Sequence, residues 1–366
     1  MMKTAVVILN WNTEGFLKEF LPGLLRSVKG VEGAEVIVAD NASTDGSMAV
    51  MREMFPEVQT ILLDRNYGFT GGYNRALEQI DAEYFVLINS DIEVTPEWLS
   101  PLVEWMDSHP ECGVCAPKLH SWQERDKFEY AGAAGGYIDR FGYPFCRGRV
   151  MKRLETDNGQ YDVPADVFWA TGACLMVRAS VYKGLGGLDE RFFAHMEEID
   201  LCWRMQLAGY KVTVVPQSVV YHVGGGTLPA ESPFKLFLNY RNNLLMLDNN
   251  LAMTMAVKHY EAGMPSGKAA AKGLCQAKWR ICMRKCLDWT SAAVYLLSGR
   301  KSCFEAVVKA HKEYRSMTER TDLKKTRSYL EGLKCSISIN GMYKGSIVLS
   351  SMISGNKVFD HIRKNV

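Results

Sequence analysis

The sequence predicts an α/β fold: a mostly parallel, doubly wound sheet with a helical extension at the carboxyl end. Apolar strand-like runs alternate with helix-length segments over the first hundred residues. Asn and Asp residues follow these runs directly, as they do at the edge of such a sheet. The composition, 47% hydrophobic and 23% charged, is globular, and 366 residues suffice for one large domain or two ordinary ones.

The first hundred residues supply four strands and the helices between them. Helices are expected over 13–28, from the turn Ser43–Gly46 to Met54, and around 74–80 after a glycine-rich opening. Strands separated by helices of this length indicate right-handed crossovers and parallel pairing. The four strands are the Val- and Ile-rich runs TAVVILNW, AEVIVADN, VQTILLD and YFVLINSD.

The middle of the chain is less regular. Thr95 and Pro96 open a helix over 96–110, whereas 118–165 is rich in Gly and aromatic residues and indicates a β-hairpin region or a mobile flap. The apolar pattern resumes at VFWATGACLMVRASVY. A helix over 197–209, closed by Gly209, is followed by the extended run KVTVVPQSVVYH.

The charge is divided unevenly along the chain. Residues 1–250 hold 22 Lys/Arg against 33 Asp/Glu, which is −11, and residues 251–366 hold 21 against 8, which is +13. The basic part should meet an anionic partner, either nucleic acid or an anionic membrane surface. The helical pattern of 278–297, with Trp279 and several basic residues, is typical of an interfacial helix; a core helix with a solvated basic face is the alternative.

Cysteine usage and hydropathy indicate a cytoplasmic protein. The ten cysteines are scattered, no signal peptide is recognisable, and no apolar window reaches the roughly 18 residues of a spanning helix. Cys112 and Cys115 form a lone C-x-x-C pair, which does not favour structural zinc.

Polar residues at the strand ends predict a ligand site. Asn10 and Asn12, Asp40 and Asn41, Asp64 to Asn66, and Asn89 to Asp91 each follow an apolar strand. Ligands of open α/β sheets bind at this edge, although Asn and Asp also favour turns and helix caps. Asp91 is suited to a hard cation, and Asp40 to hydrogen bonds with a base or ribose.

A second acidic group lies at the start of the helix over 197–209. Glu197, Glu198 and Asp200 repel one another and resist burial, so a cation or a proton-transfer task would explain them; a solvated helix start is the alternative. The chain has no P-loop, no G-x-G-x-x-G after its first strand and no serine nucleophile elbow, which argues against NTPases, dinucleotide enzymes and serine hydrolases.

Six segments carry a family resemblance. Over residues 3–250 the chain resembles the family 2 glycosyltransferases, and within them the bacterial rhamnosyltransferase-like branch. The segments, in the family's order, are VVILNWNTEGFL, VIVADNASTDGS, RNYGFTGGYNRAL, VLINSDIEVTPEWL, GACLMVRASVYKGLGGLDERFFAHMEEIDLCWRMQLAGY and VVYHVGG.

The resemblance implies a GT-A fold, the αβα sandwich of nucleotide-diphospho-sugar transferases. Residues 1–235 would form the catalytic domain, with a nucleotide-binding half at about 1–115 and an acceptor-binding half at 116–235. Residues 236–366 would form a basic helical region able to meet a membrane surface. The resemblance also implies a Mg²⁺ or Mn²⁺ cofactor and inverting transfer from a UDP- or dTDP-sugar.

The resemblance implies roles for individual residues. Glu198 would be the general base, with Glu197 and Asp200 shaping its environment, and Asp91 and His222 would bind the metal. Asn89 stands where the D-x-D motif has its first Asp, so the site offers one formal charge fewer and His222 becomes a more useful ligand. Acceptor contacts are expected at Trp169 and Gly172, and the donor-binding set is Asn10, Asn12, Asp40, Asn66, Asn74, Asn89 and Ser90.

The expected function is transfer of a sugar, rhamnose in the resembling branch, to a saccharide or lipid-linked saccharide in cell-surface polysaccharide synthesis. The expected partners are the donor, the acceptor, an anionic membrane at the inner face of the plasma membrane and a second copy of the chain, but not nucleic acid. One alternative is a sugar nucleotidyltransferase, which would carry a basic Gly-rich loop where this chain has Asn10–Thr13. The other is a non-catalytic nucleotide-sugar-binding protein, which would not need to keep Asp91, Glu198 and His222.

Overall fold

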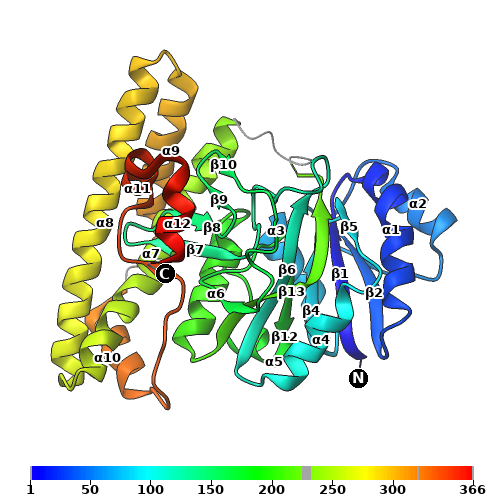
Figure 1. Cartoon of the computed structure of the whole chain (residues 1–366), viewed down its shortest axis with the longest axis horizontal. Helices are drawn as coiled ribbons and strands as arrows, with labels where there is room; N and C mark the ends of the chain where they lie inside the picture. The colour runs from blue at the N-terminus through cyan, green and yellow to red at the C-terminus, as the bar shows by residue number, and fades with distance from the viewer. Residues whose placement is uncertain (1, 225–231, 320, 365–366) are drawn as a thin grey trace.

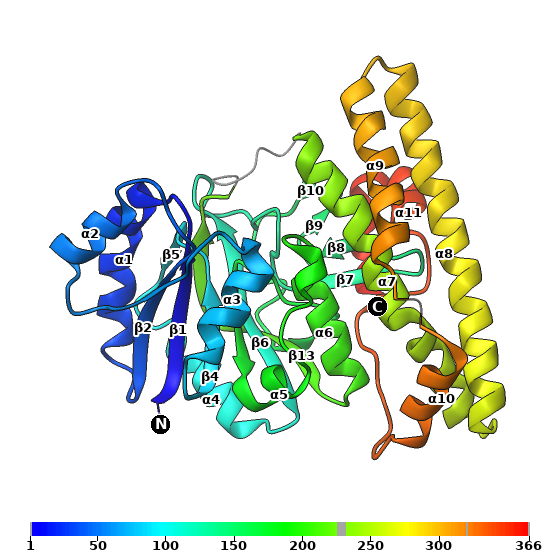
Figure 2. The same cartoon turned by 180° about the vertical axis from the view of Figure 1, so that it is seen from behind.

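The structure, a computed structural model, describes residues 2–224, 232–319 and 321–364. A central sheet of nine strands carries helices on both faces, and a second sheet of five short strands lies between it and the carboxyl-terminal helices (Figures 1 and 2). The central sheet has the order β11-β13-β6-β12-β4-β1-β2-β3, with β5 paired to β13. Its strands are β1 (Met2–Asn10), β2 (Ala34–Asp40), β3 (Gln59–Leu62), β4 (Ala82–Ile88), β5 (Ile92–Val94), β6 (Cys112–Ser121), β11 (Ala165–Asp166), β12 (Cys174–Arg178) and β13 (Lys211–His222).

Parallel pairing dominates the amino-terminal half of this sheet, as the strand–helix alternation predicts. β1 lies between β2 and β4, parallel to both, and its register pairs Asn10 with Asp40. β12 then runs antiparallel between β4 and β6, whereas β13 returns parallel to β6. The α/β fold is confirmed, and the sheet is mixed beyond β4.

Alternating residues of the strands face the two helical layers. Val6 and Ile8 of β1 pack with α1, α2 and α4, whereas Ala5 and Val7 pack with α3, α5 and α6. The sheet is therefore buried on both faces, which is why its strands read as continuous apolar runs. The helices are α1 (Glu14–Val28), α2 (Ser47–Met54), α3 (Gly68–Glu78), α4 (Leu99–Ser108), α5 (Ala179–Gly184) and α6 (Glu197–Leu207), with the 3₁₀ turn η1 (Glu190–Phe192).

The segment that reads as irregular in the sequence forms most of the second sheet. β7 and β8 make an antiparallel hairpin, β9 and β10 extend it, and a strand from near the carboxyl end pairs with β7 in parallel. The order is β10-β9-β8-β7-β14. The strands are β7 (Gly136–Asp139), β8 (Pro144–Cys146), β9 (Arg149–Val150), β10 (Arg153–Leu154) and β14 (Met342–Tyr343).

The rest of the chain is helical and packs beside α6 and the second sheet, at the end of the molecule away from β2 and α2 (Figures 1 and 2). Two long helices, α7 and α8, pack along each other, and α7 also contacts α6. Among the described residues no helix combines the length and hydropathy needed to cross a bilayer. The helices are α7 (Pro233–Glu261), α8 (Ser266–Leu297), α9 (Lys301–Met317), α10 (Leu323–Glu331), α11 (Ile347–Ser354) and α12 (Val358–Arg363), with the 3₁₀ turn η2 (Gly355–Lys357).

The helix that reads as interfacial in the sequence has one face committed to the interior. Arg284 and Asp288 of α8 are buried and joined by a 2.8 Å hydrogen bond, and His311 of α9 lies 3.3 Å from the same carboxylate. Trp279 and Trp289 remain exposed on the other side. Both Cys112 and Cys115 are buried as free thiols.

Candidate active site

The carboxyl ends of β1 and β2 form a pre-arranged polar edge. Because the two strands are parallel and in register, Asn10 and Asp40 end side by side, and the Asn10 amide donates to Asp40 Oδ1 over 2.8 Å. The backbone N–H of Ser43 donates to Asp40 Oδ2 over 3.0 Å. Each carboxylate oxygen keeps a second lone pair that can accept a hydrogen bond from a ligand.

Asn12 joins the loop after β1 to the loop after β2. It adopts a left-handed conformation with φ of 56°, which Asn tolerates better than most residues. Its side-chain oxygen accepts from the backbone N–H of Thr44 over 2.7 Å, and its own N–H donates to Ser43 Oγ over 3.0 Å. Asn12 is exposed and shapes the rim of this edge.

Asn66 belongs to the turn that precedes α3. Its side-chain oxygen accepts from Asn41 and from the backbone N–H of Gly68, which has a φ of +72°. A Cβ at Gly68 would lie 2.4 Å from the Phe193 ring, so only glycine permits this approach. Phe193 in turn accepts hydrogen bonds from the backbone N–H groups of Phe69 and Thr70. The turn therefore connects the polar edge at the ends of β1 and β2 to the segment that precedes α6.

Asp91 and His222 meet where β4 and β13 end. His222 pairs with Ile92 in register, and its Nε2 lies 3.2 Å from Asp91 Oδ1. Its other ring nitrogen, Nδ1, lies 3.3 Å from Glu129 Oε1. All three side chains are buried, while Asn89 and Ser90 just before them are partly exposed. The imidazole is therefore held between two carboxylates.

The charge around His222 suits a cation. Burial lowers the pKa of the imidazole, but the hydrogen bonds with Asp91 and Glu129 outweigh it and raise the pKa to about 10. The field that retains a proton here also attracts a divalent ion. Carboxylate oxygen and imidazole nitrogen are both ligands of Mn²⁺, and a carboxylate behind the imidazole is the usual support for a metal-binding His.

The protein offers only part of a coordination shell. Among the described residues no group of three or more His, Cys, Asp or Glu side chains converges to hold a metal ion. Two protein ligands are nevertheless compatible with a magnesium- or manganese-type site, because such ions keep waters and take further oxygens from substrate phosphates.

The turn before α6 is strained and braced from α7. Phe193, His195 and Met196 all have positive φ, at 64°, 70° and 73°. The side-chain amide of Asn242 donates to the carbonyls of Phe192, Ala194 and His195 at 2.7–2.9 Å, and it is fully buried. Such conformations persist only where the surroundings over-determine them. Asn242 supplies that constraint.

Arg241 adds to the same brace. Its guanidinium donates to the carbonyl of Phe192 over 2.9 Å and to that of Arg191 over 3.2 Å. The turn that delivers α6 into the site is thus fixed by side chains of α7.

Glu197 and Glu198 begin α6 and behave differently. Burial and the neighbouring Glu198 raise the pKa of Glu197 well above its usual range. Burial also raises the pKa of Glu198, to about 7, although backbone N–H groups at the start of α6 and at Gly172 oppose the shift. Glu198 is therefore poised to take or release a proton near neutral pH.

Gly172 brings the two parts of the site together. A Cβ at this position would lie 3.7 Å from the Glu198 Cβ, and the neighbouring Ala173 carbonyl accepts from the backbone N–H of Asn89 over 2.9 Å. The glycine turn therefore lies between the acidic start of α6 and the end of β4. The turn thereby links Glu198 to Asn89, which lies two residues before Asp91 of the Asp91–His222 pair.

Three other residues singled out from the sequence are committed to internal contacts. Asp200 is fully buried and binds Arg204, Asn249 and Asn250 at 2.7–3.0 Å, so it braces α6 against α7. Asn74 binds both the N–H and the carbonyl of Leu188. Trp169 is 4% exposed, and its indole N–H donates to the Tyr137 carbonyl. In the structure the polar groups of these three side chains bind neighbouring parts of the protein and hold the surrounding segments in place.

Sequence reasoning missed Glu129, His195, Arg241 and Asn242. Glu129 lies in the segment without a clear periodic pattern, so nothing marked it. Burial lowers the pKa of His195 to about 4, and its Nε2 is a buried atom without a hydrogen-bond partner among the described residues. The Arg241-Asn242 pair at the start of RNNLLML was a recognisable signal, because polar residues interrupt an apolar helix there.

Comparison with known proteins gives a consistent result. Residues 5–186 match the family model described as glycosyl transferase family 2. An N-acetylglucosaminyl-diphospho-decaprenol L-rhamnosyltransferase of Mycobacterium tuberculosis is 28% identical over 240 residues, which cover 59% of this chain and 75% of the relative. The rhamnosyltransferase WbbL of Escherichia coli K12 is 23% identical over 233 residues, covering 59% and 82%.

Two solved structures show the fold. GalNAc-T7 with UDP, GalNAc and Mn²⁺ matches with a TM-score of 0.51 and 15% identity, covering 72% of this chain and 52% of that one. TarS 1–349 of S. aureus in complex with UDP-GlcNAc matches with a TM-score of 0.50 and 15% identity, covering 88% and 94%. The GT-A fold expected from the sequence is confirmed.

Proposed function

The chain belongs to glycosyl transferase family 2 and is a glycosyltransferase, and on that premise we propose that it moves a sugar with inversion from a UDP- or dTDP-sugar to a lipid-linked saccharide. The observation that carries the proposal is the Gly172–Ala173 turn, which lies against Glu198 on one side and binds the backbone of Asn89, two residues before the Asp91–His222 pair, on the other. Inversion requires a single displacement, which one base and one leaving-group site suffice to perform.

Asp40 and Asn10 would bind the nucleotide. The lone pairs left on the Asp40 carboxylate can accept hydrogen bonds from the base or the ribose, while Asn10 fixes the carboxylate in place. Asn12 and Asn66 would shape the loops around it through their backbone contacts. Asn89 and Ser90 lie next to Asp91 and would contact the diphosphate.

Asp91 and His222 would hold Mg²⁺ or Mn²⁺, with Glu129 orienting the imidazole from behind. The ion would neutralise the negative charge that grows on the departing nucleoside diphosphate. Since Asn89 adds no charge, the nucleotide phosphates would have to complete the shell.

Glu198 would accept the proton of the acceptor hydroxyl as that oxygen attacks the anomeric carbon. A positioned base contributes about 10²–10⁴-fold to such a step. Glu197 beside it, whose pKa burial and Glu198 raise well above its usual range, would shape the environment of the base. Gly172 would leave room for the acceptor, and the unpaired Nε2 of His195 is a candidate hydrogen-bond partner for it.

The acceptor class is proposed from two observations. The relative from Mycobacterium tuberculosis acts on a diphospho-decaprenol-linked sugar according to its name, and this chain carries a net charge of +13 over residues 251–366. A lipid-linked acceptor lies at a membrane, and an anionic membrane surface attracts a basic protein. We therefore place the reaction at the inner face of the plasma membrane.

Two measurements test the proposal. Isothermal titration of the purified chain with UDP and with dTDP, each with and without Mn²⁺, should show binding of one nucleotide that strengthens with the ion. The Asp40→Ala variant should weaken binding in both conditions, and Asp91→Asn should remove only the effect of Mn²⁺. Transfer is then assayed with UDP-GlcNAc or dTDP-rhamnose and a synthetic polyprenyl-diphospho-GlcNAc acceptor. Absence of binding to either nucleotide, with or without Mn²⁺, would overturn the proposal.

A further inference from the structure

Two segments that are far apart in the sequence lie side by side on the surface. The Arg153 guanidinium of β10 donates to Ser351 Oγ of α11 over 2.8 Å. Val150 and Ile347 belong to one buried cluster beneath them. Residues 147–154 and 342–357 therefore form one surface, which we call the α11 surface.

The α11 surface exposes a concentration of large apolar side chains. Leu349, Met352 and Ile353 of α11 are 59%, 77% and 84% exposed, and Met151 and Leu154 of the adjoining segment are also exposed. Exposed apolar side chains scattered singly need no explanation, but a contiguous group marks an interaction site. In Figures 1 and 2 α11 lies on the outside of the molecule, in the half toward which the carboxyl ends of β1 and β4 point.

The charge of the α11 surface is of one sign. Residues 147–154 and 342–357 contain no Asp or Glu. The acids that follow closely, Glu155 and Asp360, both bind Arg363. The basic residues are Arg147, Arg149, Lys152, Arg153, Lys344 and Lys357. An apolar group in segments whose charged residues are all basic complements an anionic lipid surface, where apolar side chains enter the acyl boundary and cations meet headgroups.

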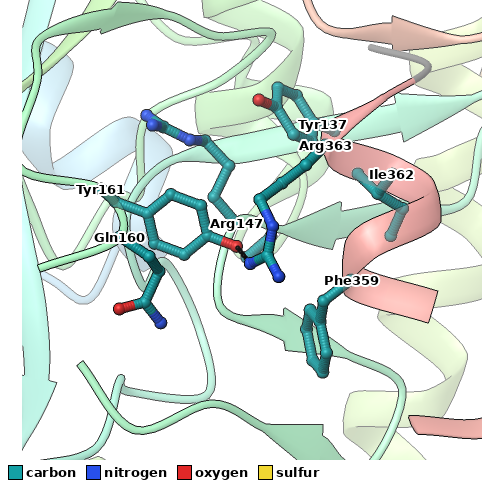
Figure 3. A pocket seen from close by; sticks show the side chains of 8 residues that line it. Tyr137, Arg147, Gln160, Tyr161, Phe359, Ile362 and Arg363 are labelled. Carbon is teal, nitrogen blue, oxygen red and sulfur yellow. Dashed lines mark hydrogen bonds between the residues drawn. The ribbon is translucent and has the colours of Figure 1, made fainter. Parts of the chain in front are cut away.

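The α11 surface is held firmly to the body of the protein. Arg363 of α12 donates to Glu155 and to the Tyr161 hydroxyl, and Figure 3 shows the contact with Tyr161. Tyr161, Phe359 and Arg363 line a cavity of about 250 Å³ between α12 and the second sheet. Asp139 caps the start of α11 by accepting from the Ile347 N–H over 3.0 Å. A fixed platform of this kind can set the orientation of the active site relative to what it binds.

We propose that the α11 surface docks the protein on an anionic lipid bilayer. The proposal deepens the proposed function, on which it rests for the reason why a membrane is needed. It places the contact on α11 and the segment 147–154, and not on α8, which reads as an interfacial helix in the sequence through Trp279 and its basic residues. On α8 the charged pair Arg284–Asp288 faces the interior, and the exposed apolar side chains are spread along the helix from Trp279 to Leu297.

Flotation with vesicles tests the proposal on the whole chain. Two kinds of vesicle are compared at about 0.1 M salt. One contains phosphatidylcholine with about 30% phosphatidylglycerol, and the other contains phosphatidylcholine alone. The wild type should float with the anionic vesicles only. The variant Leu349→Ser/Met352→Ser/Ile353→Ser should lose at least about tenfold in partitioning, because three apolar side chains no longer enter the bilayer. The control Met54→Ser/Leu62→Ser/Val163→Ser removes equally exposed apolar side chains elsewhere and should bind as the wild type does.

A charge variant provides a second, independent measurement. Lys152→Ser/Lys344→Ser/Lys357→Ser changes exposed side chains only and should lose about tenfold or more, with a weaker dependence on salt. Its control, Lys29→Ser/Lys268→Ser/Lys324→Ser, removes the same charge from other exposed positions and should lose much less.

Three results would overturn the proposal. The first is that the wild type fails to float with anionic vesicles. The second is that Trp279→Ser/Trp289→Ser abolishes flotation while the α11 variant still floats. The third is that light scattering shows a dimer that the α11 variant dissociates, because the surface would then bind a second copy of the chain. Nucleotide titration of each variant separates the two proposals. Vesicle binding without nucleotide binding would refute the proposed function and leave the docking surface standing.

Discussion

The polar edge at the ends of β1 and β2 and the start of α6 both carry carboxylates, but they are built in different ways. We call the first region the donor edge, because we propose that it binds the sugar donor. At the donor edge, Asp40 is held by Asn10 and by the Ser43 backbone, which the register of two neighbouring strands brings together. At the start of α6, Glu198 follows three residues with positive φ that Asn242, on a different helix, holds in place.

This difference determines the chemistry of each region. The Asp40 carboxylate is fixed by the Asn10 amide and the Ser43 backbone. At Glu198 the cost of burying the carboxylate outweighs the backbone N–H groups around it, so its pKa rises to about 7 and the carboxylate can exchange a proton. A site that binds can be built from the sheet itself, whereas a site that transfers a proton here needs a strained turn and a second helix to support it.

The sharpest test of the contrast is Glu198→Gln. We expect turnover to fall by about 10²–10⁴-fold, because the amide cannot accept the acceptor proton, while nucleotide binding stays unchanged. Turnover is measured with saturating donor and acceptor, and nucleotide binding by titration. Glu190→Gln, at an exposed acid of the adjoining turn, is the control. Near-normal turnover in Glu198→Gln would show that Glu198 is not the base.

Asn242→Ala tests whether the strained turn depends on α7. Three carbonyls lose their donor, so we expect a loss of about 2–4 kcal/mol in the free energy of unfolding, measured with urea. The neighbouring Asn243→Ala removes a single buried hydrogen bond, to Gly142, and should cost about 1 kcal/mol. Equal losses in the two variants would show that the turn does not rely on Asn242.

Glu129→Gln probes the support behind His222. Loss of a carboxylate behind a metal-binding imidazole typically costs about 10–100-fold in metal affinity or activity. We expect that loss in the Mn²⁺ dependence of nucleotide binding. Glu124→Gln, at an exposed acid that binds only Lys127, should leave the Mn²⁺ dependence unchanged. An unaltered Mn²⁺ titration in Glu129→Gln would contradict the role of Glu129.

The pH dependence of turnover should be the mildest effect. Because Glu198 must be ionised and its pKa is raised to about 7, the rate at saturating substrate should rise with pH and level off above about pH 7. Below that value it should fall about tenfold per pH unit. A rate that stays flat from about pH 5.5 to pH 8 would show that Glu198 does not titrate in the rate-determining step.

The donor edge could be predicted from the sequence, and the support of α6 could not. Parallel strands end at one edge, so Asn10, Asp40 and Asp91 could be brought together from their positions after apolar runs alone. Glu129 reaches His222 from a segment with no periodic pattern, and Asn242 lies 47 residues beyond His195 in the sequence. Both contacts depend on tertiary packing: no local pattern marks Glu129, and the polar pair Arg241-Asn242 in an apolar helix shows that something is bound there but not what it binds. For the same reason Trp169 and Asn74 read as ligand contacts although their polar atoms bind the main chain.

The brace from α7 also has a consequence for the order in which the protein forms. Chains emerge from the ribosome with the amino-terminal end first. The Asn10–Asp40 contact spans 30 residues and lies entirely in the first strands, so the donor edge can assemble early. The turn before α6 cannot be held until Asn242 of α7 has been synthesised, so the start of α6 is fixed later than the donor edge. We therefore expect activity to appear only after α7 has packed on α6.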